Sequence, residues 1–460
     1  MTFDLAFSRF ETRRNTGVFV MEDHTWKQLS PSFMRANNIP YSSVPKENSQ
    51  QFSASLSLNN ISSYLERLLI KGYTIKTDII HNSIYPYVVQ GVYYNALYEF
   101  IITDNAKGYG GSLQADFALP AENKLTLGVD YDFSEVHSIA DYEQGYALFY
   151  VDEDREGESS TIAFFAQNEW RPISTLMISA GLRYSTIRNK VTKYRNFPDR
   201  VSEAKNSSTV GSLGVVFDAS DELAIRALYS QGYRAPSLNQ QLMGLIQYFQ
   251  INPDLKPERS QNYELGLRYV GSGLNADLSF FYSTLKDAFY QHDTGVPIPN
   301  SVYTYQQTRN AEKAKAKGAE VAISYDIADT GLTPYVSFTA MRYERQYNNG
   351  KKTKNTGVPH SWGMGGFRYS NNYNSDLRLF GDARLTWSGG FFDEPAGNLS
   401  SGASIYGKGL KGDVTIGLEA GVDHKYQAIL SFRNIGDTDF QPWGWFQPGF
   451  HIVAAVGFEY

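Results

Sequence analysis

The feature that most constrains this chain is a strict alternation of apolar and polar residues that recurs along much of its length. In residues 176–184 one set of alternate positions is apolar, and the other carries Met177, Ser179, Gly181 and Arg183. The pattern returns in residues 223–230, 263–269, 274–282 and 414–420. Strict alternation predicts β-strands whose two faces meet different surroundings. A soluble sandwich also alternates, but runs of about ten residues exceed the usual ~5–6 and favour strands that cross a membrane.

The connections between these expected strands fall into two length classes that alternate from residue 119 to the end. The short connections are 119–124, 171–175, 219–222, 270–274, 327–332, 371–376 and 422–425. The long ones lie at about 137–159, 189–207, 235–259, 289–302, 346–358, 389–410 and 435–449. A transmembrane β-barrel predicts this alternation, because its periplasmic turns are short and its extracellular loops are long. The last strand, at about 450–460, then runs toward the periplasm and ends there.

The expected fold is all-β, a transmembrane antiparallel β-barrel of about 20–22 strands over residues 1–460. From residue 108 onward we expect about fifteen strands, and the first hundred residues add about three to six. The chain begins with alternating residues 3–7, which we interpret as a strand, and residues 65–87 form either one strand pair or two. Since a barrel in lipid must close, we expect the sequence to be incomplete at its start.

Composition excludes several other classes of protein. The chain has no cysteine, so disulfide frameworks and thiolate metal sites are excluded. Its mean hydropathy is −0.39, and no apolar run approaches the ~18 residues of a membrane helix. The net charge of −6 argues against nucleic acid as a partner. The 33 Tyr and 28 Phe fit the aromatic girdles of a barrel and its loops.

Two motifs carry a resemblance to a known family. The first is Tyr233, Arg234, Ala235 and Pro236 after Gly232, and the second is Asn252, Pro253, Asp254, Leu255, Lys256, Pro257 and Glu258. Together they resemble the paired boxes of TonB-dependent outer-membrane receptors, which flank one extracellular loop in the middle of the barrel. Residues 310–321 are similar to the next recurrent strand of that family. The last strand alternates through Phe458 to Tyr460, which is similar to the terminal signal for outer-membrane assembly.

The resemblance implies energised uptake of a scarce ligand, most often a ferric siderophore and sometimes haem or cobalamin, with no enzymatic chemistry and no resident cofactor or metal. It also implies a Gram-negative outer membrane, the barrel-assembly machinery, and an inner-membrane TonB complex that acts through a plug. No plug or signal peptide is recognisable in the sequence. We therefore expect this chain to be the barrel portion, with its plug upstream or in another chain.

Aromatic residues in long loops are the candidate ligand-binding residues. They are Tyr142, Tyr146, Tyr248, Trp443, Trp445 and Phe446. Flat aromatic faces suit the rings of iron chelates, although the same residues can fold the loops or join the aromatic belt. Haem is disfavoured, because no histidine lies in residues 237–251 between the two boxes. We expect the boxes to be mainly structural, since Pro236 and Pro257 stop strands and Arg234 can pair with acidic groups.

Charged and histidine residues elsewhere give weaker signals. The seven histidines are scattered singly, and we expect His137, in a predicted extracellular segment, to be solvated. The acidic run 151–156 is expected to bridge divalent cations with lipopolysaccharide or to be solvated, and 351–354 to steer anionic ligands. No G-x-S-x-G or H-E-x-x-H motif is present, which disfavours an outer-membrane hydrolase. A passive porin remains an alternative.

Overall fold

The computed structural model describes residues 1–13, 19–22, 25–28, 46–89, 92–141, 153–195, 202–241, 249–298, 304–348, 350–355, 357–392, 405–421, 426–440 and 447–458. Most of them form one antiparallel sheet of nineteen strands. No helix within these residues is long and apolar enough to cross a membrane.

The strands of this sheet follow one another in chain order, each paired antiparallel with the next. They are β1 (Thr2–Arg13), β4 (Lys46–Asn59), β5 (Leu65–Val89), β6 (Val92–Leu119), β7 (Asn123–Asp141), β8 (Glu153–Ile173), β9 (Leu176–Tyr194), β10 (Glu203–Asp218), β11 (Leu223–Arg234), β13 (Glu258–Gly271), β14 (Leu274–Lys286), β17 (Lys313–Tyr325), β18 (Leu332–Gln346), β20 (Ser361–Asn374), β21 (Leu377–Phe392), β22 (Ile405–Ala420), β23 (Tyr426–Arg433) and β24 (His451–Phe458). The short β19 (Lys352–Lys354) pairs with the end of β18.

The expected strand pattern is confirmed with two refinements. Apart from β19, fifteen strands of the sheet lie from β6 onward, and β1, β4 and β5 precede them. Residues 65–87, which the sequence left open, belong to the single strand β5. The nineteen strands fall just below the expected 20–22, and short connections alternate with long ones as predicted.

The strands extend farther than the alternation alone predicted. β7 continues to Asp141 and β8 begins at Glu153, so His137 and residues 153–156 lie in strands and not in the long loop predicted at 137–159. Correspondingly, β9 reaches Tyr194 and β10 begins at Glu203. The difference arises because backbone pairing continues beyond the membrane, where both faces of a hairpin carry polar residues and the two-residue contrast is lost.

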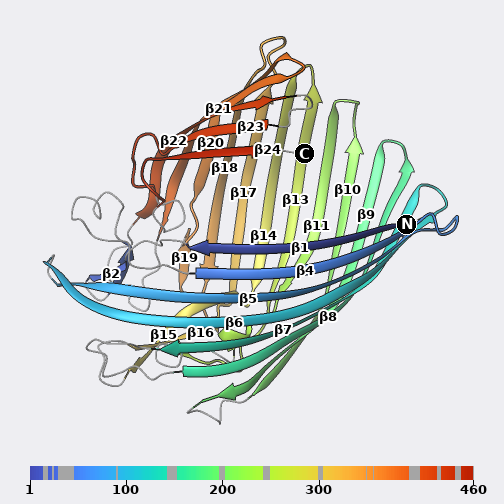
Figure 1. Cartoon of the computed structure of the whole chain (residues 1–460). Helices are drawn as coiled ribbons and strands as arrows, with labels where there is room; N and C mark the ends of the chain where they lie inside the picture. Colours follow the sequence, from blue (N-terminus) through green and yellow to red (C-terminus); the bar gives the residue numbers. More distant parts are fainter. Residues whose placement is uncertain are drawn as a thin grey trace.

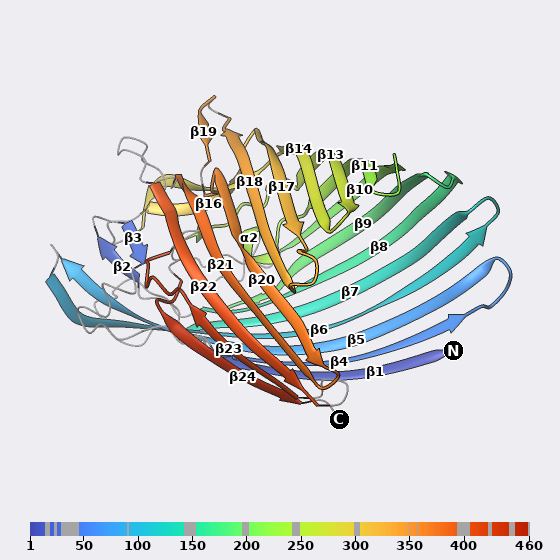
Figure 2. The ribbon, with the colours of Figure 1, turned by 90° about the horizontal axis from the view of Figure 1, so that it is seen from above.

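The sheet curls back on itself, with β1, β4 and β5 crossing in front of β13, β14 and β17 in Figure 1. Figure 2 shows the same curl from above. Within the described residues, β1 pairs only with β4 and β24 only with β23, so the sheet is not closed between these two edges.

The two faces of the curled sheet differ as the alternation predicted. The outward face carries exposed apolar side chains, such as Leu182 (58% exposed), Leu265 (53%) and Phe280 (51%). Outward tyrosines form a row at the ends nearer the long loops, where Tyr229 lies 5.1 Å from Tyr263 and Tyr263 lies 6.3 Å from Tyr282 between ring centroids. Such rows are typical of the aromatic girdle at a membrane–water interface.

Smaller elements lie outside the main sheet. β2 (Phe19–Glu22) pairs with β3 (Thr25–Gln28), and β15 (Phe289–Pro297) forms a hairpin with β16 (Thr304–Asn310), which β12 (Phe249–Gln250) joins in parallel. The one-turn α2 (Leu238–Gln241) follows β11. Buried apolar contacts gather at this loop end, where Ala288, Ala311, Ala314 and Tyr347 pack together.

Candidate functional site: the inner wall and the loop end

The inner face of the sheet carries charged side chains that neutralise one another. Arg226 of β11 donates two hydrogen bonds to the Asp277 carboxylate, at 2.6 and 2.7 Å, and a third to Glu264 at 3.2 Å. These residues occupy the alternate positions opposite the outward apolar set, and the register β11–β13–β14 aligns them across three strands. The guanidinium therefore crosslinks strands that lie 51 residues apart in sequence.

The same arrangement recurs around the inner face. Further inward pairs are Arg67–Asp116 (2.6 Å), Arg183–Asp130 (2.7 Å), Arg378–Glu419 (3.1 Å), Arg384–Asp413 (3.3 Å), Tyr73–Asp132 (2.5 Å) and Tyr335–Asp382 (2.7 Å). In such a wall the carboxylates are paired with arginine or accept hydrogen bonds from tyrosine, and a polar surface of this kind suits a water-filled interior.

Inward glycines make room for two phenylalanine rings on this wall. Gly128 faces Phe165 across β7 and β8, and Gly417 faces Phe380 across β21 and β22. A Cβ atom added at either glycine would collide with the facing ring. Arg183 and Arg378 lie over these rings, at 5.7 and 5.8 Å from the centroids. The rings therefore lie along the wall beneath arginines that also take part in the ion pairs.

The two sequence boxes come together at the loop end of the sheet. Arg234 at the end of β11 forms an ion pair of 2.5 Å with Glu258 at the start of β13, and the Glu258 side chain is only 8% exposed. The other Glu258 oxygen accepts a hydrogen bond from the backbone N–H of Phe289, whose ring lies 4.7 Å below the Arg234 guanidinium. The pair therefore fixes the base of the loop between the boxes to the β15–β16 hairpin.

The rest of the second box is held by backbone and amide hydrogen bonds. Asn252 donates to the carbonyl of Thr308 at 2.9 Å, and Asn310 bonds both the N–H and the C=O of Lys256. Leu255 is 2% exposed. In the first box, the Pro236 carbonyl accepts a hydrogen bond from buried Asn189 of β9 at 3.0 Å. These contacts join three hairpins at the loop end, β9–β10, β11–β13 and β15–β16.

The predicted aromatic ligand-binding residues lie outside the described residues: Tyr142, Tyr146, Tyr248, Trp443, Trp445 and Phe446, as does Tyr460. Both ends of the last loop are described. Phe440 is 2% exposed and packs against Gly409 and Lys411, while the backbone N–H of Phe450 donates to Asp437 at 2.7 Å. Phe458 is 64% exposed on the edge strand β24.

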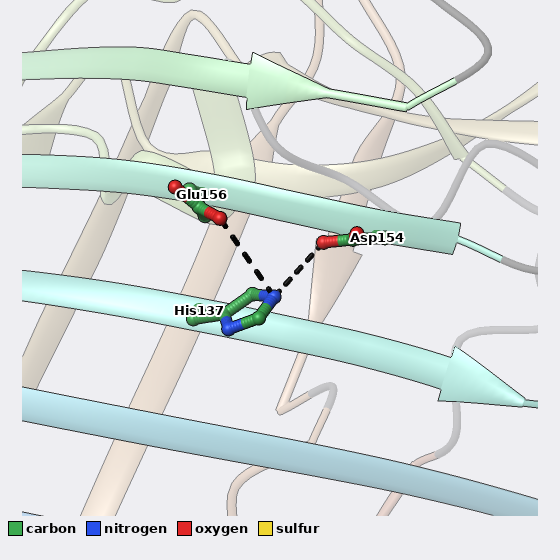
Figure 3. Close-up of side chains that lie close together, drawn as sticks. All are labelled: His137, Asp154 and Glu156. Carbon is green, nitrogen blue, oxygen red and sulfur yellow. Dashed lines mark hydrogen bonds and ion pairs between the residues drawn. The ribbon is translucent and has the colours of Figure 1, made fainter.

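One cluster with metal-ligating side chains was not predicted. His137 Nε2 lies 2.9 Å from Asp154 Oδ1 and 3.9 Å from Glu156 Oε1. Figure 3 shows the three side chains, with His137 on β7 and the two carboxylates on β8. All three side chains point outward, away from the interior, because they share the parity of Tyr131 and Ile162. The two-residue spacing of Asp154 and Glu156 was the available sequence signal.

An ammonium group already binds the two carboxylates of this cluster. Lys193 of β9 lies 3.0 Å from Asp154 and 3.0 Å from Glu156. Burial would raise the pKa of Asp154, but the hydrogen bonds from Lys193 and His137 outweigh it and hold that pKa below its usual value. A cation at this position neutralises the site, so the geometry favours an ion-paired surface cluster over a metal centre.

A hollow of about 880 Å³ is lined by residues of β17, β18 and β20–β22, including Ile323, Val336, Phe367, Leu385 and Leu410. These five side chains belong to the outward apolar set, since Val336, Phe367 and Leu385 follow the register of exposed Phe338. The hollow is therefore lined largely by the outward apolar surface, although Tyr335, Arg384 and Asp413 of the inner wall also border it.

Comparison with known proteins identifies the family to which this β-barrel domain belongs. Residues 2–449 match the family model described as TonB dependent receptor-like, beta-barrel. The siderophore receptor PiuA from Acinetobacter baumannii has a TM-score of 0.70 at 14% identity, over 100% of this chain and 72% of that one. The ferric yersiniabactin uptake receptor FyuA from Yersinia pestis has a TM-score of 0.66 at 15% identity, over 99% and 65%.

Relatives by sequence match over shorter segments. The iron-regulated outer membrane virulence protein of Vibrio cholerae serotype O1 is 35% identical over 117 residues, which are 22% of this chain and 17% of that protein. The hemoglobin-haptoglobin utilization protein B of Neisseria meningitidis serogroup A is 27% identical over 206 residues, 39% of this chain and 25% of that protein. The chain thus matches a quarter or less of the length of these relatives.

Proposed function

The chain belongs to the TonB-dependent receptor family, and on this basis we propose that it forms the barrel of an outer-membrane transporter for energy-coupled uptake of a ferric siderophore or a similar iron complex. The family match over residues 2–449 is the observation that carries this proposal. Structural neighbours that are named as receptors for iron chelates support it. The polar inner wall supports it physically, because a polar, water-facing interior suits the passage of a polar chelate.

In this proposal the chain performs no catalysis and holds its ligand by loop and wall contacts. The outward apolar face lies in the outer membrane of a Gram-negative bacterium, and the barrel-assembly machinery recognises the C-terminal residues Phe458 and Tyr460. A plug from outside the printed sequence fills the interior and couples it to the inner-membrane TonB complex. The boxes act structurally, since the Arg234–Glu258 pair and Leu255 fasten the loop end.

The aromatic loop at Trp443, Trp445 and Phe446, with Tyr142, Tyr146 and Tyr248, is the proposed first contact for the chelate. The buried anchor Phe440 and the Phe450–Asp437 hydrogen bond fix both ends of the last loop. Replacing Trp443, Trp445 and Phe446 together with alanine in the full-length receptor should weaken chelate binding while the barrel still assembles. Unchanged affinity in a well-assembled triple mutant would remove this loop from the proposal.

Haem uptake is the second candidate, and the resemblance to a hemoglobin-haptoglobin utilization protein favours it. Against it, residues 237–251 between the boxes contain no histidine. Growth of a gene deletion strain separates these ligands. The strain is grown with a ferric chelate or haem as the sole iron source, or with cobalamin as the required nutrient. The siderophore proposal expects loss of growth on one class of ferric chelate, with growth on haem and cobalamin unchanged. Loss of growth on haem alone would favour haem uptake over siderophore uptake. Unchanged growth on every source would contradict both proposals.

A further inference from the structure

The last loop, residues 435–449, is fastened at its base by one buried asparagine. Asn434 directly follows β23 and is 1% exposed. Its amide nitrogen donates to the carbonyl oxygens of Thr438 at 2.8 Å and Pro448 at 3.2 Å, and its amide oxygen accepts the backbone N–H of Thr438 at 3.1 Å. Thr438 lies in the outgoing stem of the loop and Pro448 in the returning stem. One side chain therefore ties together the two stems that flank residues 441–446.

The backbone conformation explains why asparagine suits this position. The φ angle of Asn434 is 51°, in the left-handed region that asparagine and glycine adopt more readily than other residues. The backbone N–H of Asn434 donates to Asp413 Oδ1 on β22 at 2.9 Å. The asparagine thus binds the loop with its side chain and the neighbouring strand with its backbone. We call Asn434 and Asp413 the loop clamp.

Asp413 joins the loop clamp to the inner wall. Its side chain is 2% exposed, and its two carboxylate oxygens have different partners. Oδ1 accepts the N–H of Asn434, as described above. Oδ2 lies near three cations, at 3.3 Å from Arg384, 3.7 Å from Lys411 and 4.0 Å from Arg433. One carboxylate is therefore divided between the loop and the charged groups of the wall.

Asn355 provides a matched comparison in the same molecule. It is also buried, at 7% exposed, and its φ angle is 50°. Its amide nitrogen donates to the carbonyl of Met341 at 3.1 Å, and its amide oxygen accepts the N–H of Tyr343 at 3.4 Å. Both of these partners belong to β18, so this carboxamide fastens its loop to a single strand. Asn434 differs because it links two loop stems to a charged group of another strand.

We propose that Asn434 and Asp413 are positioning residues for ligand capture, which hold the two stems of the last loop so that residues 441–446 receive the iron chelate. This inference rests on the proposed uptake of such a chelate through the aromatic residues of that segment. A loop that must be ordered at the moment of binding lowers the affinity, and a loop fixed beforehand avoids that cost. Neither clamp residue contacts the chelate, so its effect on binding passes through the position of the loop.

Two glycine variants of the full-length receptor separate this role from general stability. Asn434→Gly removes the carboxamide and keeps the turn, because glycine adopts a positive φ without strain. Asn355→Gly makes the same change at the matched position. The experiment measures uptake, over a range of concentrations, of the radioiron-labelled ferric chelate on which the gene deletion strain fails to grow. The half-saturation concentration should rise at least about tenfold in Asn434→Gly and stay within about twofold in Asn355→Gly, with the maximal rate nearly unchanged in both.

Two variants of Asp413 separate its hydrogen bond from its charge. Asp413→Asn and Asp413→Leu both remove the negative charge beside the three cations, but only the first keeps an oxygen that can accept the N–H of Asn434. The half-saturation concentration should therefore rise at least about fivefold more in Asp413→Leu than in Asp413→Asn. Equal rises would assign the effect to the lost charge and overturn the clamp.

The position of the loop is also measured without any chelate. This chain has no cysteine, so Gln441→Cys gives it a single site for a nitroxide spin label, with any cysteine elsewhere in the full-length receptor replaced by serine. The label should move faster when Asn434→Gly is added, and its motion should not change when Asn355→Gly is added. Unchanged motion in the first case, or an equal rise of the half-saturation concentration in both glycine variants, would overturn the inference. Absence of gene-dependent uptake of any ferric chelate would overturn the proposed function together with the capture role, and the spin label would then still decide whether the clamp holds the loop.

Discussion

In β11, β13 and β14, successive residues point alternately to the inner and the outer face of the sheet, and the two faces meet opposite surroundings. On the inner face, Arg226, Glu264 and Asp277 satisfy one another in a polar interior. On the outer face, Leu265 and Phe280 are exposed and face each other across the strands, with Ala227 and Ala319 as their other cross-strand partners. Surface exposure therefore has two meanings in this molecule, since exposed inner residues meet water and exposed outer residues meet lipid.

The largest expected effect comes from placing a charge on the outer face. Leu265→Arg puts a guanidinium near the middle of the apolar band and should cost about 2–4 kcal/mol of folding free energy in a bilayer. The matched control is Leu228→Arg on the inner face, where Leu228 is 41% exposed and faces Glu264. Urea unfolding in lipid vesicles should show a large loss for the first and little change for the second. Equal losses would mean that the two faces are assigned wrongly.

A smaller effect is expected from filling the inner wall. Gly417→Val forces a side chain against the ring of Phe380 in the middle of two paired strands. Overpacking of this kind costs about 1–3 kcal/mol. Combining Gly417→Val with Phe380→Ala should recover part of that loss, because the second change removes the ring. Additive losses in this double-mutant cycle would show that the two residues do not meet.

The inner ion pairs should contribute less, because they face water. Arg226→Leu leaves Asp277 and Glu264 without their shared partner, and we expect a loss of about 1 kcal/mol, since solvent screens groups that are about one-third exposed. Arg226→Lys keeps the charge and should lose less than Arg226→Leu. The midpoint of urea unfolding measures both variants, and an unchanged midpoint for Arg226→Leu would show that the network does not stabilise the wall.

The smallest effect is expected at the outward cluster of His137, Asp154, Glu156 and Lys193. Its charges are partly exposed to solvent beyond the membrane, so Lys193→Met should change the unfolding midpoint only slightly. Zinc should not shift the midpoint of the unaltered receptor, because Lys193 occupies the carboxylates. A clear zinc-dependent stabilisation would instead identify the cluster as a metal site.

Much of the fold was predictable because alternation fixes which face each residue joins. The strand order, the alternating connections and the outward tyrosines follow from that periodicity. The cross-strand partners did not, because Arg226 and Asp277 are 51 residues apart and meet only through the register of three strands. The continuation of β7 through His137 was not predicted. Beyond the lipid both faces of the strand can be polar, so the backbone pairs without any alternation of apolar and polar residues in the sequence.

The candidate site was predictable only in part. The boxes were recognised from their residues, but the buried partner Asn189 and the Phe289 ring under Arg234 come from distant hairpins.

Uptake of a radioiron-labelled chelate by whole cells tests whether this receptor transports its ligand in an energy-coupled way. The measurement compares a gene deletion strain, the same strain complemented with the full-length gene, and complemented cells treated with a protonophore, using the chelate on which the deletion strain fails to grow. Energy-coupled transport predicts saturable uptake that requires the gene and disappears when the proton gradient collapses. Gene-dependent uptake that rises linearly with chelate concentration and ignores the protonophore would contradict it and identify a passive pore.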